Sequence, residues 1–325
     1  MKKNTTAVVN KGVDMSYSRS LQNKPFLGIV LQLFGIALYP ISDAFVKTFM
    51  EIYSVPQATF LRALVRIMPL LVLVFFQGGF KHVFSLQQSK LHIVRLLINV
   101  GSTFCFMYAF SLTSLTTVYT FGYTTPIFIL ILSTFFLKES LKLHQWLTIA
   151  VGLITVILGI RPGAGIFEIA ALLVLLASFL AALNKVLMRR LASTEHSLAI
   201  AIYPNILIML IASPFLFLAG HWQSLPWSHW GIFAMVGAIT AIGQYAIAQA
   251  LRFAKASTLA PADYSSFFWA VCIDLLWWNK TPDKYTLLSA AIIMISCFFI
   301  LYRSKREELN KNNSLKLNKL IIVKT

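Results

Sequence analysis

Charged residues are scarce in this chain of 325 residues: they occupy 12% of the positions, and Asp and Glu together number only 11. A soluble domain carries about 25% charged residues. Hydrophobic residues make up 58% of the chain, and the mean hydropathy is +0.75. Because so few charges cannot cover the surface of a soluble protein of this size, the composition predicts that most of the chain lies in lipid.

The sequence also lacks the motifs that bind phosphate, metal or a catalytic nucleophile. There is no GKS or GKT phosphate loop, no HExxH and no nucleophile elbow, and the six histidines are scattered in or near expected loops. The three cysteines, Cys105, Cys272 and Cys297, lie far apart within apolar stretches and lack metal-ligand spacing. We therefore expect no enzyme, no cofactor and no metal site, and we expect the cysteines to be small packing residues.

Ten apolar stretches, most of them about 20 residues long, fill most of the chain. Twenty helical residues at 1.5 Å each match a hydrocarbon core of roughly 30 Å, so each stretch predicts one transmembrane helix. The predicted spans are 25–46, 57–77, 91–112, 115–137, 143–160, 165–186, 198–220, 230–252, 258–279 and 284–303.

The last five spans repeat the first five. A shift of 141 positions lays each span of residues 165–303 over its counterpart in residues 25–160. Because five is odd, the second set must cross the membrane in the opposite sense. Inverted repeats of this kind are typical of alternating-access transporters that bind substrate near the bilayer midplane. The sequence predicts an all-α membrane protein of ten transmembrane helices, arranged as two inverted five-helix repeats.

The positive charges are unevenly distributed between the two sides of the predicted bundle. Of the 28 Lys and Arg, 22 lie at the ends assigned to one side, which the positive-inside rule makes cytoplasmic. Both termini are then cytoplasmic: residues 1–24 as a tail before an uncleaved first helix, and residues 304–325 as a basic tail. This placement explains the net charge of +17 without a nucleic-acid partner. The expected partners are lipid and a small-molecule substrate.

An ionisable residue within a predicted span needs a partner or a water-filled pathway, and four such residues stand out: Asp43, Arg62, Arg66 and Asp274. Asp43, Arg62 and Asp274 fall at similar depths in the outward half, and Arg66 lies one turn deeper than Arg62 on the same face. One interpretation is that Arg62 or Arg66 binds an anionic substrate group or belongs to a gate. The other is that the residues pair permanently to hold helices together. Asn184 matches Asp43 in the second repeat.

Spans 4 and 9 carry the richest binding chemistry. Tyr119 and Tyr123 share a face of span 4 with Pro126. In span 9, a continuous helix would place Asp263 and Asp274 near one face about three turns apart, with aromatic residues between and beside them. Such a stripe could hold a cationic or heterocyclic ligand by stacking and cation–π contact. The alternative is ordinary interfacial aromatics with Asp263 solvated at the cytoplasmic mouth. The aromatic candidates of span 9 are Tyr264 and Trp269.

Span 8 contributes Gln244 and Gln249, which either line a cavity or hydrogen-bond between helices. We expect spans 1, 3, 4, 6, 8 and 9 to line the cavity. Spans 5 and 10 are then peripheral, where they could support a homodimer. Lys138 and Glu139, at the end of span 4, are most simply explained as a solvated pair.

The chain resembles the drug/metabolite transporter superfamily, and within it the EamA family. The similarity covers both repeats, with Arg62 and Lys47 at the positions of a common arginine and lysine. Lys280 and Trp278 depart from the usual pattern after span 9. The stretches that carry the resemblance are Phe104–Ala109, Pro126, Phe136–Glu139, Gln145–Leu147, Val151–Leu153, Ala248–Arg252 and Ala256–Pro261.

Within that family, the stretch Thr258–Tyr264 is similar to S-adenosylmethionine uptake carriers of intracellular bacteria. The resemblance implies a multi-pass protein of the bacterial inner membrane that takes up S-adenosylmethionine or a related amino-acid-like solute. Asp263, Asp274 and the tyrosines would face the cationic and aromatic parts of such a ligand, and Arg62 or Arg66 its carboxylate. Efflux of amino acids or drugs stays open, as does a membrane scaffold or enzyme that transports nothing.

Overall fold

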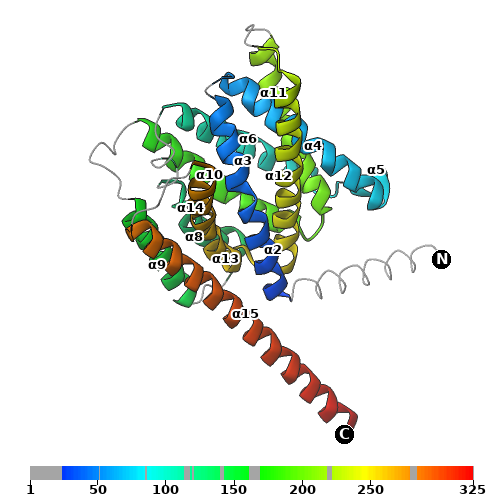
Figure 1. Ribbon diagram of the computed structural model, residues 1–325. Coiled ribbons are helices and arrows are strands. Elements are labelled where there is room, and N and C mark those ends of the chain that lie inside the picture. The colour runs from blue at the N-terminus through cyan, green and yellow to red at the C-terminus, as the bar shows by residue number, and fades with distance from the viewer. Residues whose placement is uncertain are drawn as a thin grey trace, which may run out of the picture.

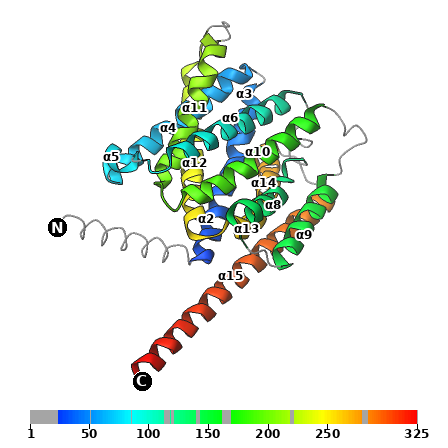
Figure 2. The same ribbon diagram turned by 180° about the vertical axis from the view of Figure 1, so that it is seen from behind.

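The computed structural model describes residues 24–324 apart from 51, 85, 113–117, 119–120, 140–142, 161–168, 218–221 and 279–283. This part of the chain is helical, with one 3₁₀ turn and no strand (Figure 1, Figure 2). Its elements are α2 (Pro25–Ala37), α3 (Tyr39–Met50), α4 (Val55–Phe76), α5 (Gly79–Val83), α6 (Ser89–Leu112), α8 (Thr125–Leu137), α9 (Leu143–Ile160), α10 (Ile169–Leu191), α11 (Ser197–Phe217), α12 (Trp227–Phe253), α13 (Ala256–Leu259), η1 (Ala260–Tyr264), α14 (Ser265–Trp278) and α15 (Lys284–Lys324).

Seven helical segments of the described residues are long and apolar enough to cross a membrane. They correspond to predicted spans 1, 2, 3, 6, 7, 8 and 10, with α2 and α3 together forming span 1. Spans 4 and 5 contain the shorter apolar helices Thr125–Leu137 and Gln145–Thr155. Span 9 is divided into α13, η1 and α14. The chain is therefore a multi-pass, all-helical membrane protein, and the count of ten crossings stays a prediction.

Helices of the two predicted repeats pack against one another throughout the bundle. Helix α6 packs on α10, α4 on α11, and α12 on both α2 and α4. Helices α9 and α15 lie side by side at one edge (Figure 1, Figure 2). The views also show α15 extending beyond the bundle at the end where α2 begins. The bundle is thus held together by contacts between the halves.

Helices α2 and α12 approach each other through small residues. An added Cβ on Gly35 would lie 2.8 Å from the Gly243 carbonyl oxygen, and one on Gly243 would lie 2.9 Å from that of Gly35. About two turns earlier on α2, a Cβ on Gly28 would lie 2.6 Å from the Cβ of Ala254. Small residues let two backbones come this close, and close backbone packing is a main source of association between helices in lipid.

Prolines inside α4 and α11 each leave one backbone carbonyl without its helical hydrogen-bond donor, and a residue of another helix lies next to that carbonyl. Pro204 has no N–H for the Ile200 carbonyl, and the Arg95 Nη2 donates to that oxygen at 2.9 Å. Arg95 is fully buried. Pro69 likewise leaves the Val65 carbonyl without its helical donor. That oxygen lies 2.6 Å from where a Cβ of Gly237 would stand, so only glycine fits there.

Replacing Arg95 by methionine is expected to cost about 1–3 kcal/mol, because it leaves the Ile200 carbonyl buried without a donor. In a Pro204→Ala background the helix supplies that donor itself, so the same substitution should cost about 1 kcal/mol less. Thermal unfolding of the four proteins in detergent measures this coupling. An equal cost in both backgrounds would show that Arg95 acts by filling space and not by capping the carbonyl.

The prediction that Glu139 forms a solvated pair with Lys138 is wrong. Glu139 is buried, and its Oε2 accepts hydrogen bonds from the backbone N–H of Ser257 at 3.2 Å and from the Ser257 hydroxyl at 2.5 Å. The Arg189 guanidinium lies 4.0 Å from the other carboxylate oxygen. The chain reverses after α8 through Lys138, whose φ of 51° is left-handed. This turn directs Glu139 to the start of α13 and ties the two repeats together.

Candidate functional site

A cavity of about 420 Å³ lies in the middle of the bundle. It is lined by α3, α4, α6, α8, α10, α11, α12, η1, α14 and the residues just before α8. The expected lining by spans 1, 3, 4, 6, 8 and 9 is therefore extended by spans 2 and 7. Among the described residues, none of those on α9 or α15 lines the cavity. The residues that line it include Tyr39, Asp43, Thr59, Arg62, Arg66, Asn99, Ser102, Thr103, Phe106, Gly122, Tyr123, Thr125, Asn205, Gln244, Asp263 and Ser266.

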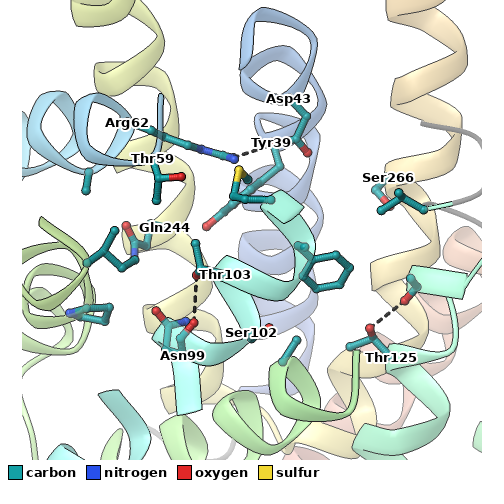
Figure 3. Close-up of a pocket in the computed structure, with 18 of the residues that line it drawn as sticks. Tyr39, Asp43, Thr59, Arg62, Asn99, Ser102, Thr103, Thr125, Gln244 and Ser266 are labelled. Atoms are coloured by element: carbon teal, nitrogen blue, oxygen red, sulfur yellow. Dashed lines mark hydrogen bonds and ion pairs between the residues drawn. The ribbon is translucent and has the colours of Figure 1, made fainter. Parts of the chain in front are cut away.

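One wall of the cavity carries an ion pair between α3 and α4. The Arg62 Nη2 lies 2.7 Å from the Asp43 Oδ1, and Figure 3 shows the guanidinium directed at that carboxylate. Both side chains are partly buried, with 16% and 20% of their surface exposed. The two residues predicted to lie at similar depth thus contact each other. Arg62 is neutralised by a partner in its own repeat.

Arg66 lies one turn further along α4 and has no carboxylate partner among the described residues. It is 9% exposed, and its Nε donates to the Thr240 hydroxyl at 3.3 Å. Its Cζ is 6.0 Å from the centre of the Tyr39 ring. The buried Nη2 has no acceptor within the described part of the chain. Arg66 therefore places a guanidinium with an unused donor at the cavity wall.

Apart from the charged residues, the polar lining consists of amides and hydroxyls, several of which already have hydrogen-bond partners. The Thr103 hydroxyl donates to the Asn99 carbonyl at 2.9 Å, and the Ser102 hydroxyl donates to that of Ala177 at 2.9 Å. Asn205 donates from Nδ2 to the Gln244 Oε1 at 3.0 Å. Figure 3 shows Asn99, Thr103, Thr59 and Gln244 grouped on the same side as the Arg62 pair. This side of the cavity thus combines the Asp43–Arg62 ion pair with uncharged polar groups.

The opening of predicted span 4 lies on the opposite side of the cavity. The Tyr123 hydroxyl accepts a hydrogen bond from the Ser266 hydroxyl at 3.2 Å. The Thr125 hydroxyl donates to the Gly122 carbonyl at 2.7 Å, and Pro126 at the start of α8 removes that carbonyl's helical donor. Gly122, Tyr123 and Thr125 therefore line the cavity at the turn of residues 123–124 that precedes α8. Tyr119 lies outside the described residues.

Asp263 lines the cavity and is already paired with an internal cation. The Lys185 Nζ on α10 lies 2.7 Å from Oδ1 and 2.6 Å from Oδ2, and the Gln32 Nε2 on α2 donates to Oδ1 at 2.7 Å. The exposed fractions of the Lys185 and Asp263 side chains are 13% and 18%. The alternative in which Asp263 is solvated at a cytoplasmic mouth is therefore wrong. Lys185 is one of the 22 basic residues that the sequence assigns to the cytoplasmic side, yet it contacts a residue of the cavity wall.

The aromatic stripe expected along span 9 does not form as predicted. That expectation assumed one continuous helix, whereas Asp263 belongs to η1 and α14 begins only at Ser265. Tyr264 is buried, with its ring 5.9 Å from that of Tyr123 and packed where a side chain on Gly152 would stand. Trp269 makes an edge-to-face contact with Phe268 at 5.2 Å. Neither ring lines the cavity. Asp274 lies on α14, and its side chain is outside the described residues.

Two further candidates lie away from the cavity. Gln249 donates to the Tyr245 hydroxyl at 2.6 Å, and that hydroxyl also contacts Gln77 on α4 at 2.9 Å. Asn184 directs its Nδ2 toward the Met188 sulfur at 3.9 Å and is not placed at the Asp43 pair. The hydrogen bond of Gln249 is therefore within α12, and Tyr245 makes the contact to Gln77.

Comparison with known proteins identifies the family of the chain. The model of the EamA-like transporter family matches residues 22–161 and 168–302, which overlap the two predicted repeats. A protein of known crystal structure shares the fold, with a TM-score of 0.71 at 16% identity over 86% of this chain and 98% of that one.

Several relatives are named as transporters. An S-adenosylmethionine uptake transporter of Rickettsia bellii is 25% identical over 70% of this chain and 77% of its own. A riboflavin transporter of Vibrio cholerae is 29% identical over 58% of this chain and 63% of its own. A pseudopaline exporter of Pseudomonas aeruginosa is 22% identical over 86% of this chain and 97% of its own. The chain therefore belongs to the EamA-like transporter family, and the sequence prediction of a transporter and not an enzyme is confirmed.

Proposed function

We propose that the protein is a secondary transporter that takes up a small, carboxylate-bearing metabolite by alternating access, with S-adenosylmethionine or a related amino-acid-like solute as the substrate. The observation that carries the proposal is Arg66, a buried guanidinium at the cavity wall with an unused donor. Arginine binds carboxylates through two parallel hydrogen bonds, which makes it well suited to this group. Arg62 is already paired with Asp43.

The rest of the cavity suits a ligand with polar and planar parts. Its volume of about 420 Å³ falls within the range of small-molecule sites, roughly 300–1,000 Å³. Phe106, Tyr39 and Tyr123 provide aromatic surface for a heterocycle, while Asn99 and Gln244 provide amide groups. An adenosyl amino acid presents complementary groups: a planar base, hydroxyls and a carboxylate.

The relatives support this substrate class and leave the direction as the second question. Uptake is favoured by the similarity to S-adenosylmethionine uptake transporters. Export of an amino-acid-like metabolite is the second candidate, supported by the similarity to a pseudopaline exporter over nearly the whole chain. We also propose the bacterial inner membrane as the location, cytoplasmic termini, ten crossings, and α9 with α15 as the surface of a homodimer.

Uptake of labelled S-adenosylmethionine into proteoliposomes tests the substrate. We expect uptake that is blocked by excess S-adenosylhomocysteine, which keeps the carboxylate, and blocked far less by decarboxylated S-adenosylmethionine, which lacks it. Efflux from preloaded vesicles compares the two directions. Equal competition by both analogues would remove the carboxylate from recognition, and no accumulation above empty vesicles would remove this substrate.

A further inference from the structure

Lys185 is partly buried and does not line the cavity, yet it is paired with Asp263, which does. Both carboxylate oxygens of Asp263 accept hydrogen bonds from the Lys185 ammonium at 2.6–2.7 Å. Gln32 adds a third donor to the same carboxylate. The network joins α2, α10 and η1, so it spans both repeats. Burying charged side chains is costly unless they are paired and hydrogen-bonded, and this network supplies both to Asp263.

Pairing with Lys185 leaves one positive charge of the cavity wall without a carboxylate partner among the described residues. Among the described residues, the wall carries two carboxylates, Asp43 and Asp263, and two guanidiniums, Arg62 and Arg66. Asp43 is paired with Arg62 and Asp263 with Lys185. Arg66 is left as the wall's cation without a carboxylate partner in the described structure. Without Lys185, the unpaired Asp263 would offset Arg66 and offer a second site, one for cations.

We propose that Lys185 is a specificity-determining residue: it neutralises Asp263 from behind and so makes the cavity select for a ligand's anionic group at Arg66. The residue acts through Asp263 and is a positioning group, not a direct ligand contact. The inference rests on the proposed function only in taking this cavity as the substrate site. It names the property that Lys185 controls, which is the sign of the charge that the cavity prefers.

The test measures the charge of the cavity without any substrate. A reporter cysteine replaces Thr103, whose hydroxyl bonds only within its own helix, in a chain whose three native cysteines are changed to alanine. The purified protein in detergent reacts with a trimethylammonium methanethiosulfonate and with a sulfonate methanethiosulfonate. The ratio of the two rates reports the local potential, because a cation reacts faster where the site is negative. The variants are Lys185→Met, Asp263→Asn and the double variant.

We expect Lys185→Met to raise the cation-to-anion ratio by about 100-fold. At an assumed separation of roughly 10 Å and an effective dielectric constant near 20, a unit charge changes the rate of each reagent by about tenfold, in opposite directions for the cation and the anion. Asp263→Asn should lower the ratio by a similar factor, because it leaves the Lys185 charge unpaired. The double variant should return to the starting ratio. Opposite shifts from the two single variants, with cancellation in the double, cannot arise from loosened packing alone.

Two controls define the outcome. Lys185→Arg keeps the charge and should keep the ratio, and Lys284→Met removes an exposed lysine on α15 that does not line the cavity. An unchanged ratio in Lys185→Met, or shifts of the same sign in both single variants, would overturn the proposal. Because no transported solute enters this experiment, a failure of S-adenosylmethionine uptake leaves its result intact.

Discussion

Replacing Arg66 by glutamine is expected to lower S-adenosylmethionine uptake at low substrate concentration by about 100-fold. Removing one partner of a buried, hydrogen-bonded charge pair typically costs 2–5 kcal/mol, and 2.7 kcal/mol corresponds to that factor. Glutamine keeps a hydrogen-bond donor and much of the volume but loses the charge and the two-pronged geometry. Initial uptake rates in proteoliposomes with equal amounts of folded protein measure the effect.

Matched variants separate recognition by Arg66 from general damage. Arg66→Lys restores the charge without the planar group and should recover only part of the uptake. Arg190→Gln removes an exposed arginine at the end of α10 and should change uptake little. Decarboxylated S-adenosylmethionine has no carboxylate to lose, so its weak binding should be nearly the same with and without Arg66. An equal loss of binding for ligands with and without the carboxylate would assign Arg66 a structural role.

The ion pair of the cavity wall could be predicted from the sequence because each partner is a charged residue in an otherwise apolar span. Asp43 and Arg62 are charged residues in apolar spans whose directions are known, so their depths can be compared. The same reasoning identified Arg66 as a candidate. It could not decide between the two arginines, because that choice depends on which guanidinium Asp43 reaches.

Lys185 was missed because its position in the sequence has an ordinary explanation. It lies little more than one turn before Arg189 and Arg190 at the end of α10, where the positive-inside rule expects basic residues. The signal that could have found it is Asp263, a carboxylate opening span 9 on the same predicted side. Recognising the pair also requires knowing that span 9 begins with α13 and η1, because this irregular start brings Asp263 to the cavity wall.

The amide and hydroxyl residues that line the cavity could not be identified as such from the sequence. Asn205 follows Pro204 in an otherwise apolar span, and Asn99 and Thr103 share a face of α6. Each has a plausible role in helix packing when considered alone, and several do hydrogen-bond to their own helix. Only the crossing of α4, α6 and α11 around one space makes them cavity residues. Periodicity along one helix contains no information about which helix lies opposite.

Gly243→Leu is expected to destabilise the protein by about 3 kcal/mol and to lower its thermal unfolding midpoint in detergent by several degrees. Its Cβ would lie 2.9 Å from the Gly35 carbonyl oxygen and 3.3 Å from the Leu38 Cβ. A flexible side chain could relieve such a clash by changing its rotamer, but a backbone oxygen cannot. Helices α2 and α12 would therefore have to separate. Gly231→Leu is the matched control on the same helix, because nothing lies within 4 Å of a Cβ there.

The consequence for transport follows from which helices meet at this crossing. Helix α2 belongs to the first repeat and α12 to the second, and Gln32 on α2 also contacts Asp263. A Gly243 variant that separates them should therefore lose uptake in proportion to its loss of stability, and Gly243→Ala should show a smaller loss of both. If Gly243→Leu kept its stability but lost uptake, the crossing would be a moving contact of the transport cycle. If it kept both, the close approach of these helices would not hold the two halves together.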